Sequence, residues 1–441
     1  MRSVGSHSRP RMAAVEAAAV SVCLALAGCT GSGGANADES NGPATITFWD
    51  NNLGPERAPV WKHIIADFEK ANPTIKVSYA GYPITEIQKR YDAAIAHGGL
   101  PDVGMVSTAY LSDVADKNAL EPLDERVAGS SLYGRLTKAY VDLVKSAGPD
   151  AQLYTLPTSS NIAVLWLRKD LLDAAKLPVP TSWDEFYADV TKLTDKSKRK
   201  YGFTIRGSTG SIPQILEDMY AQSGIRTIFD DQDRSTVNDP ANITALEKIV
   251  ELYGAETPTA DVNNDYKKMV AEFDAQSIAV MQHNLGSYAD HVKAFGKDKI
   301  IGVPLFPAPS GRHNVVSNPV DGVGVFKSSK HTEQAWKFAE YVASQQADSY
   351  WNQQVGQIPA NKEVAREGWL RRDQPLRDAL SVVTDVTTNV VQLPYYLPQF
   401  NSIVKAGSEP QFKKVLLGQM TVTAFLNDLA QKLTDAKAKF K

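Results

Sequence analysis

The fold is decided by residues 44–106, which begin with ATITFWDNN (44–52). The run 45–49 is rich in β-branched and aromatic side chains, which favour a strand. Over 60–70 apolar side chains recur every three or four residues, which predicts an amphipathic helix. Pro73 then ends this helix, because proline disfavours the helical conformation in the residue before it.

The same stretch continues with a second helix and two more strands. Residues 75–79 alternate between apolar and polar side chains, as expected for a strand. Residues 84–96 carry an apolar stripe from Ile84 to Ile95, which predicts a helix that ends at Gly98. Residues 101–106 follow as a third strand. A βαβαβ start predicts an α/β lobe with a mainly parallel sheet, whose ligand sites lie beyond the carboxyl ends of its strands.

The rest of the chain repeats these patterns without an internal repeat or a second linker. We therefore expect lobes that interweave. The acidic run 229–233 lacks the glycine and final glutamate of a calcium-binding loop, which favours a hairpin tip. The later expected strands are 163–167, 201–205 and 278–282, and the later expected helices are 183–193, 333–344 and 422–441.

The N-terminus has the pattern of an export signal. After three arginines comes an apolar run, 17–27, of about eleven residues, which is too short to span a hydrocarbon core of ~30 Å. It ends in LAGC (26–29), which resembles the lipobox of bacterial lipoproteins. This implies removal of residues 1–28 and a lipid on Cys29. The Gly- and Ser-rich residues 29–43 then predict a flexible tether. A soluble secreted protein with an ordinary cleavage site is the alternative.

Composition excludes several classes of function. The 441 residues are 43% hydrophobic and carry a net charge of −3, so no basic excess points to nucleic acid. Only Cys23 and Cys29 are present, which excludes a disulfide framework and a thiol nucleophile in the body of the chain. No nucleophile elbow, phosphate-binding loop or zinc-protease motif occurs. We expect no metal, no cofactor and no catalytic residues.

Eight segments, taken together and in order, resemble the extracellular solute-binding proteins of carbohydrate ABC importers, the group that includes maltose-binding proteins. They cover nearly all of residues 44–345. They are ITFWD (46–50), FEKANPTIKV (68–77), GGLPDVGMV (98–106), LYTLPTSSNIAVLWLRKDLL (153–172), PTSWDEF (180–186), FDAQSIAVMQHNLGS (273–287), IIGVPLFPAPSG (300–311) and SSKHTEQAWKFAEYVAS (328–344).

The resemblance implies a two-lobed, type II-like periplasmic-binding-protein fold of the α/β class, with mainly parallel sheets flanked by helices and a ligand cleft between the lobes. The chain should cross between lobes near 157–163 and near 319–322. The implied N-terminal lobe comprises 44–157 and 320–370, and the implied C-terminal lobe comprises 158–319 and 371–441.

The resemblance also implies a receptor, not an enzyme. It would capture a mono- to small oligosaccharide and deliver it to the transmembrane subunits of an ABC permease. Cys29 would anchor it to the outer face of the cell membrane. We expect a monomer that does not bind nucleic acid.

A sugar is bound by aromatic faces and by planar polar side chains that bond to adjacent hydroxyls. Such side chains follow the first and third strands, where this family often places ligand contacts: Asn51, Asn52, Ser107, Thr108 and Tyr110. The resemblance adds further positions: Asn161, Arg206, His283, Asn284, Tyr288, Asp321, Trp351, Tyr395, Tyr396 and Phe400.

Two of these positions depart from the family pattern. The family commonly has a stacking tryptophan where this chain has Ser287, so Tyr288 either substitutes for it or the stack is lost. The family usually has a Gly-Gly pair before the position of Asp321, and that pair is absent here. Asp321 is a plausible bidentate acceptor for hydroxyls. Other tryptophans, Trp61, Trp183 and Trp336, fit the core.

Two alternatives remain open at this stage. A phosphorylated polyol such as a glycerophosphodiester would need cationic contacts, and Arg206 is the only basic residue assigned to the cleft. An exported glycoside hydrolase would need two carboxylates across the scissile bond, and no spacing singles out such a pair.

Overall fold

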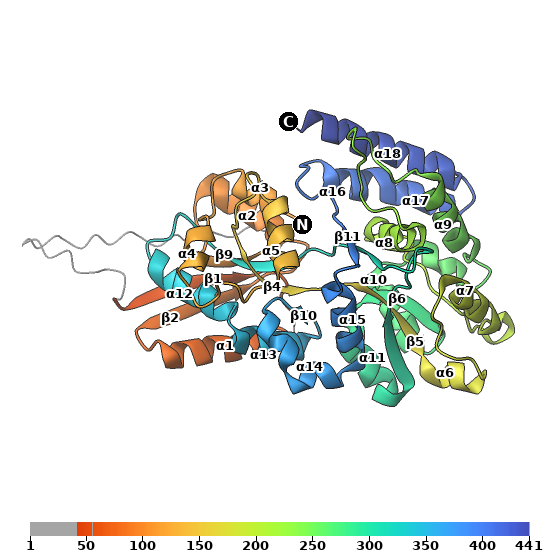
Figure 1. The fold of residues 1–441 in the computed structure, drawn as a ribbon, viewed down its shortest axis with the longest axis horizontal. Coiled ribbons are helices and arrows are strands. Elements are labelled where there is room, and N and C mark those ends of the chain that lie inside the picture. Colours follow the sequence, from red (N-terminus) through yellow and green to blue (C-terminus); the bar gives the residue numbers. More distant parts are fainter. Residues whose placement is uncertain (1–41, 55, 441) are drawn as a thin grey trace, which may run out of the picture. The chain divides into compact units, whose positions relative to one another are not determined.

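The computed structural model describes residues 42–54 and 56–440. The predicted signal peptide, Cys29 and the predicted tether up to residue 41 lie outside the described residues. The body of the chain, from Ser40 onward, forms one compact unit. Within this unit the secondary structure gathers into two lobes, each with its own sheet (Figure 1).

The first lobe is built on a six-stranded mixed sheet with the strand order β10-β4-β9-β3-β1-β2. As predicted, the first three strands run parallel, with β1 pairing to both β2 and β3. Strand β9 returns from the other lobe and pairs antiparallel to β3 and β4. The strands are β1 Ala44–Asp50, β2 Ile75–Gly81, β3 Val103–Ser107, β4 Leu156–Ser160, β9 Asp321–Val325 and β10 Ile358–Pro359.

The second lobe holds a three-stranded sheet, β6-β5-β7, in which both pairings are antiparallel. A separate parallel pair joins β8 and β11. The expectation of mainly parallel sheets is therefore wrong for this lobe, and in the first lobe it holds only for β1, β2 and β3, because only the βαβαβ start constrains strand direction. The strands are β5 Ala163–Arg168, β6 Val280–Asn284, β7 Ile300–Pro304, β8 Asn314–Val316 and β11 Asn389–Val391.

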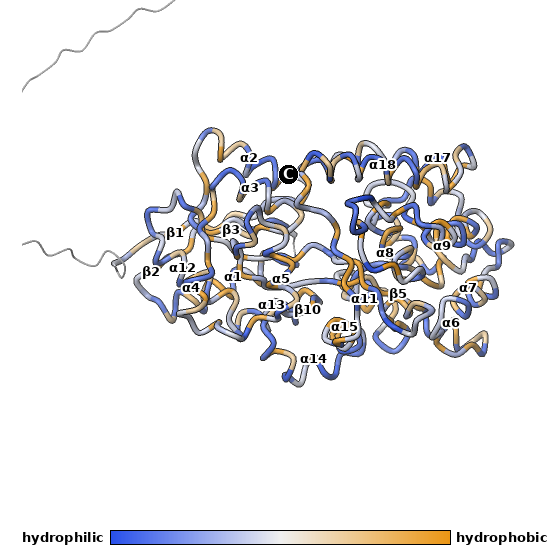
Figure 2. Tube along the Cα trace, turned by 45° about the horizontal axis from the view of Figure 1, so that its top comes forward, coloured by the Kyte–Doolittle hydropathy of each residue, from blue (hydrophilic) through white to orange (hydrophobic). Residues whose placement is uncertain are grey.

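Helices flank both sheets (Figure 1), and hydrophobic segments gather inside each lobe (Figure 2). The predicted tryptophans Trp61, Trp183 and Trp336 are buried. The longer helices are α1 Ala58–Ala71, α2 Ile87–His97, α5 Lys138–Ala147, α7 Trp183–Lys192, α8 Ser211–Ser223, α9 Pro240–Glu251, α10 Tyr266–Asp274, α11 Tyr288–Phe295, α12 Thr332–Val342, α13 Gln345–Val355, α15 Gln374–Thr384, α17 Glu409–Leu416 and α18 Val422–Lys439. Short α-helices are α3 Leu111–Ala115, α4 Asp124–Ala128, α6 Lys169–Ala174, α14 Gly368–Arg372 and α16 Phe400–Ser402.

Two local expectations are wrong. Ile84 is 58% exposed and precedes α2, which begins at Ile87, so it does not belong to the buried stripe. Residues 201–205 form no strand. Their N–H groups bond in turn to three different segments, at Ser277, Glu256 and Asp261, so no continuous ladder can form.

The chain passes between the lobes three times, at two short crossings and again after β10, from which it returns to the second lobe with β11. Residues 161–162 lead from β4 to β5, and 317–320 lead from β8 to β9. The lobes also touch directly, because Asn401 Nδ2 donates to the carbonyl oxygen of Ala109 at 3.1 Å. Among the described residues, no helix combines the length and the apolar character that crossing a bilayer requires.

Candidate functional site at the junction of the lobes

Three of the predicted ligand contacts meet at one edge of the six-stranded sheet. Asn51 follows β1, Tyr110 lies just beyond β3, and Asp321 begins β9 opposite Ser107. The Asn51 Nδ2 amide donates to the Tyr110 hydroxyl and to Asp321 Oδ1, both at 3.1 Å. The carboxyl ends of β1 and β3 and the start of the antiparallel β9 thus bring together side chains far apart in sequence.

The charge of this cluster is only partly balanced. Burial raises the pKa of Asp321, against the opposing effects of Arg57 and of the Asn51 hydrogen bond. Burial likewise raises the pKa of Asp50, which accepts a hydrogen bond from the Tyr79 hydroxyl at 3.1 Å. Sequence reasoning missed Arg57. It precedes α1 and lies in an irregular loop, where no pattern marks it.

The other predicted residues at this edge are buried or form hydrogen bonds with nearby protein groups. Thr108 and Val320 share two hydrogen bonds of 3.0 Å. The Thr108 N–H donates to the Val320 carbonyl oxygen, and the Val320 N–H donates to the Thr108 hydroxyl. Ser107 is also buried. Asn52 donates its backbone N–H to Asp50 Oδ1 at 3.2 Å. Thr108 therefore fixes the second crossing next to Asp321.

A second polar cluster lies on the other side of that crossing. Glu217, on α8, accepts hydrogen bonds from Asn318 Nδ2 at 2.8 Å and from Gln282 Nε2 at 3.1 Å, one on each carboxylate oxygen. Burial raises its pKa to about 7, although the positive charge of Arg206 and these hydrogen bonds favour the ionised form. Sequence reasoning missed Glu217, because a glutamate within a helix carries no distinguishing signal.

Arg206 and Asn161, both predicted contacts, complete this side. Arg206 Nη1 donates to the Gly210 carbonyl at 3.3 Å, whereas its buried Nε has no hydrogen-bond partner among the described residues. Burial lowers the pKa of Arg206, against the attraction of Glu217 and other acidic neighbours. The buried Oδ1 of Asn161, in the first crossing, is also without a partner in this part of the chain.

The two clusters are close because the chain between them is short. Asn318 bonds to Glu217, and Asp321 lies three residues further on. Consecutive Cα atoms are 3.8 Å apart, so the Cα atoms of Asn318 and Asp321 are separated by at most about 11 Å. The second crossing therefore holds a contact of each cluster within a few residues of the other.

His283 and Asn284, at the end of β6, have partners of their own. His283 Nδ1 lies 3.0 Å from the Ser287 hydroxyl, and the imidazole stacks against the Tyr266 ring. Burial holds the pKa of His283 well below its usual range, so the ring is neutral. The Asn284 side chain accepts the Gly286 N–H at 3.0 Å.

The predicted aromatic contacts are placed differently from one another. Tyr395 is partly exposed, and burial together with the negative charge of Glu217 raises its pKa, which puts it beside the second cluster. Tyr396 packs against Phe440. Tyr288 stacks nearly parallel on Trp166, with ring centroids 5.3 Å apart. It also lines a separate depression of about 280 Å³.

Trp351 and Phe400 lie in the core, which argues against direct ligand contact. Trp351 is 4% exposed, stacks on Trp61 with centroids 4.4 Å apart, and donates its indole N–H to Gln357 Oε1. Phe400 is 1% exposed and meets Tyr395 edge-on. In this conformation neither ring has a face to offer to a ligand.

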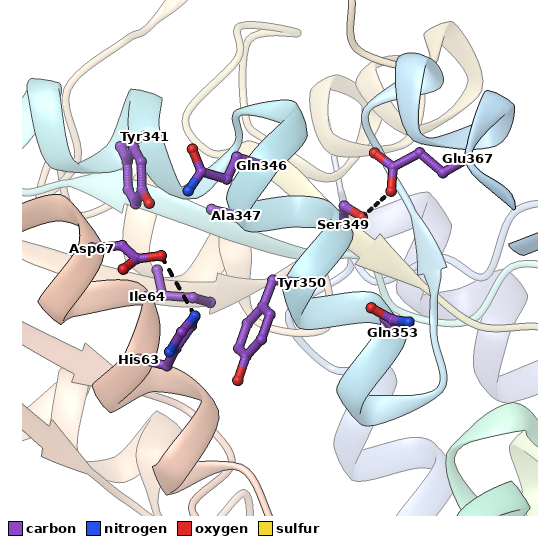
Figure 3. Close-up of a pocket in the computed structure, with 10 residues that line it drawn as sticks. All are labelled: His63, Ile64, Asp67, Tyr341, Gln346, Ala347, Ser349, Tyr350, Gln353 and Glu367. Carbon is purple, nitrogen blue, oxygen red and sulfur yellow. Dashed lines mark hydrogen bonds and ion pairs between the residues drawn. The ribbon is translucent and has the colours of Figure 1, made fainter. Parts of the chain in front are cut away.

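A further pocket, of about 320 Å³, lies between α1 and α13 (Figure 3). His63 and Tyr350 stack along one side of it, and the His63 imidazole faces Asp67 at 3.5 Å. It contains none of the predicted ligand contacts. Among the described residues, no group of His, Cys, Asp and Glu side chains has the arrangement of a metal site.

Two sheet-centred lobes, joined by short crossings at which polar clusters from both lobes meet, define a two-lobed solute-binding protein. The model of the family "Bacterial extracellular solute-binding protein" matches residues 53–348, which is more than half of the chain. The chain belongs to this family. The predicted family and the two-lobed fold class are confirmed.

Individual relatives extend the similarity over nearly the whole chain. A Brucella abortus protein that is named as a binding protein is 22% identical over 400 residues, covering 90% of this chain and 93% of the relative. The GacH receptor of Streptomyces glaucescens, solved unliganded and with acarbose, has a TM-score of 0.77 at 19% identity, covering 90% of this chain and 99% of that one. MalE3 of T. maritima, solved with maltose bound, has a TM-score of 0.76 at 22% identity, covering 88% and 98%.

Proposed function

We propose that this protein binds a carbohydrate, from a monosaccharide to a small oligosaccharide, at the junction of its lobes and delivers it to an ABC permease. One observation carries the proposal. Two carboxylates, Asp321 and Glu217, lie on either side of one short crossing, each held by side-chain amides. Carboxylates fixed in this way accept hydrogen bonds from hydroxyl groups. The ligands seen in similar structures, acarbose and maltose, support this class.

Each lobe supplies contacts of a different kind. On the first lobe, Asn51, Tyr110 and Asp321 form a polar edge. On the second, Arg206 and Asn161 bring buried atoms that still lack a partner, and Tyr395 brings the partly exposed ring that a sugar face needs. A ligand that bonds to both lobes stabilises the closed state relative to the open one, because only the closed state makes both sets of contacts.

The lipid anchor is a separate proposal. Cys29 would be lipidated after removal of residues 1–28, and residues 29–43 would tether the receptor to the outer face of the cell membrane. The supporting pattern is LAGC (26–29) after an apolar run. Cys29→Ser should move the protein from the membrane fraction to the soluble fraction. Unchanged partitioning would contradict the anchor and leave ligand binding untouched.

Thermal-shift and calorimetric screens test the ligand class. The panel contains mono-, di- and trisaccharides, glycerol 3-phosphate and short peptides. Binding stabilises the folded state as RT ln(1 + [L]/Kd), so a sugar at 100 times its Kd should add about 2.7 kcal/mol to the free energy of unfolding. Stabilisation by the phosphorylated compound alone would overturn the carbohydrate assignment. Product release from glycosides at a turnover rate would indicate an enzyme instead.

Matched variants locate the site. Asp321→Ala removes an acceptor of the proposed site and should abolish the sugar-induced shift at millimolar concentrations. Asp231→Ala removes a carboxylate from the exposed hairpin at residues 229–235 and serves as the control. Equal loss of the shift in both variants would contradict a site at the junction.

A further inference from the structure

Glu217 differs from its neighbours on α8 in one respect. Leu216 and Asp218, before and after it, are buried, whereas Glu217 keeps part of its surface exposed. Its helix packs inside the second lobe, and its side chain reaches Asn318 in the crossing that leads to Asp321. The one partly exposed acid of this stretch therefore lies at the junction of the lobes.

The carboxylate of Glu217 is held more firmly than a surface acid. Gln214 Nε2 donates to Gln282 Oε1 at 3.1 Å, and Gln282 Nε2 donates in turn to Glu217 Oε2. Asn318 fixes the other oxygen. A carboxylate has about four lone-pair sites, of which these amides fill two. Positioned acceptor capacity thus remains for two further donors.

The charges that face Glu217 come from several elements. Arg206, on the loop before α8, attracts it, whereas the buried Asp218 on the same helix and the partly exposed Tyr395 from the chain after β11 are close enough to be affected by its charge. His283, on β6, is neutral because of its burial. Around the junction, the guanidinium groups of Arg57 and Arg206 face a larger number of carboxyl groups. Arg57 interacts with Asp50 and Asp321, and Arg206 interacts with Glu217, Asp265 and Glu409.

We propose that Glu217 binds the ligand directly, accepting hydrogen bonds from two neighbouring hydroxyls, and that its charge makes the site selective for unphosphorylated polyhydroxy compounds. This inference rests on the proposed carbohydrate function and names the residue that decides its ligand class. A phosphate dianion would lie beside the Glu217 carboxylate, which the amides of Gln282 and Asn318 hold in place. Like charges in a partly buried site repel strongly.

The proposal has a consequence for pH. Hydroxyl donors favour the ionised form of Glu217, so ligand binding lowers its pKa and releases a proton where the free site is partly protonated. Burial places the pKa of the free group at about 7. Affinity should therefore rise as the pH increases from 5.5 to 8 and level off above that range.

Calorimetric titration tests this with the sugar that the panel identifies and with glycerol 3-phosphate, at pH 5.5, 7 and 8. Glu217→Gln should weaken sugar binding at pH 8 by about 10–100-fold, the range for a lost hydrogen bond to a charged group, and should flatten the pH dependence. Asp218→Asn removes the neighbouring buried acid and should stay within about threefold of wild type, with the pH dependence intact.

Three outcomes separate this proposal from the function on which it rests. A Glu217→Gln variant that binds sugar like wild type at pH 8 overturns the role of Glu217 and leaves the carbohydrate function standing. Wild type that binds only glycerol 3-phosphate, or no sugar at all, overturns both. Should Glu217→Gln fail to fold, wild-type titrations at pH 7 in two buffers of different ionisation enthalpy decide, because absence of proton release contradicts the proposal.

Discussion

The two polar clusters at the junction each centre on a carboxylate, yet they are built differently. Asp321 is the first residue of β9, and its backbone pairs with Ser107 on one neighbouring strand and Ser159 on the other. Glu217 projects from a helix, and its carboxylate accepts hydrogen bonds from the side-chain amides of Asn318 and Gln282.

The two carboxyl groups should therefore differ in how firmly their positions are fixed and in how strongly their ionisation responds to their surroundings. A residue fixed by a ladder on both sides keeps its position when one side-chain partner is lost. A residue fixed by amides depends on each of them, and its ionisation responds to small changes around it. We therefore expect the first cluster to define where a ligand lies, and the second to define which ligands and which pH values are accepted.

The largest effect on stability is expected for substitution of Trp351. This substitution tests whether an aromatic ligand contact belongs to the first cluster. Because the indole stacks on Trp61 in the core, Trp351→Ala should lower the free energy of unfolding by about 3–5 kcal/mol. Urea denaturation measures this, with Tyr133→Ala, at an exposed ring, as the control. Sugar affinity of the folded variant should match wild type. A lost affinity at unchanged stability would restore Trp351 as a ligand contact.

The next effect concerns a second titrating acid near the Glu217 side of the molecule. Asp261 accepts hydrogen bonds from the Ile205 N–H at 2.8 Å and from Asn264 Nδ2 at 3.0 Å, and burial, reinforced by the charge of Glu272, raises its pKa to about 8. The folded state thus binds a proton that the unfolded chain releases at lower pH. Stability from this group is lost as the pH rises toward 8.

Asp261→Asn should remove that loss. Relative to wild type, the variant should gain about 1–3 kcal/mol between pH 5.5 and pH 7.5, measured by urea denaturation without ligand. The pH dependence of sugar affinity should not change, because Asp261 is outside the proposed contacts. A variant that loses stability relative to wild type as the pH rises would contradict the raised pKa.

The difference between the clusters also explains what the sequence could predict. Asn51 and Tyr110 follow the first and third strands of the βαβαβ start, so the pattern of strands predicts that they share an edge, whereas Asp321 at the start of β9 was implied only by the family resemblance. The parallel start of that sheet followed from its alternating strands and helices. The antiparallel pairings depend on how distant segments return, which no local pattern encodes.

The second cluster was largely out of reach. Arg206 was predicted as a contact, but it follows an irregular segment rather than the expected strand. Glu217 is one of many glutamates on helices, and its role depends on Gln282 and Asn318, which are far away in sequence. Trp351 satisfies the same residue-type criterion as a stacking aromatic. Only burial distinguishes it from one.

A direct test of the comparison removes one amide from each cluster. Asn318→Ala frees one oxygen of Glu217 and should weaken sugar binding about tenfold, whereas Asn51→Ala leaves Asp321 fixed by its strand and should cost about threefold. Isothermal titration at pH 8 measures both, and thermal melts check that both variants fold. A larger loss in Asn51→Ala would mean that side-chain bonds, not the ladder, position Asp321.

The smallest effect is expected at Tyr288, the residue next to Ser287, whose position holds the stacking tryptophan in the family pattern. One face of this ring is already covered by Trp166, and the ring lines a depression that Lys297 and Arg372 share rather than either carboxylate cluster. Tyr288→Leu keeps apolar contact with Trp166 and should change sugar affinity by less than threefold. Because stacking on a sugar depends on an aromatic face, a loss above tenfold at an unchanged melting temperature would return Tyr288 to the site. The recognition assigned above to the polar clusters would then be shared with this ring.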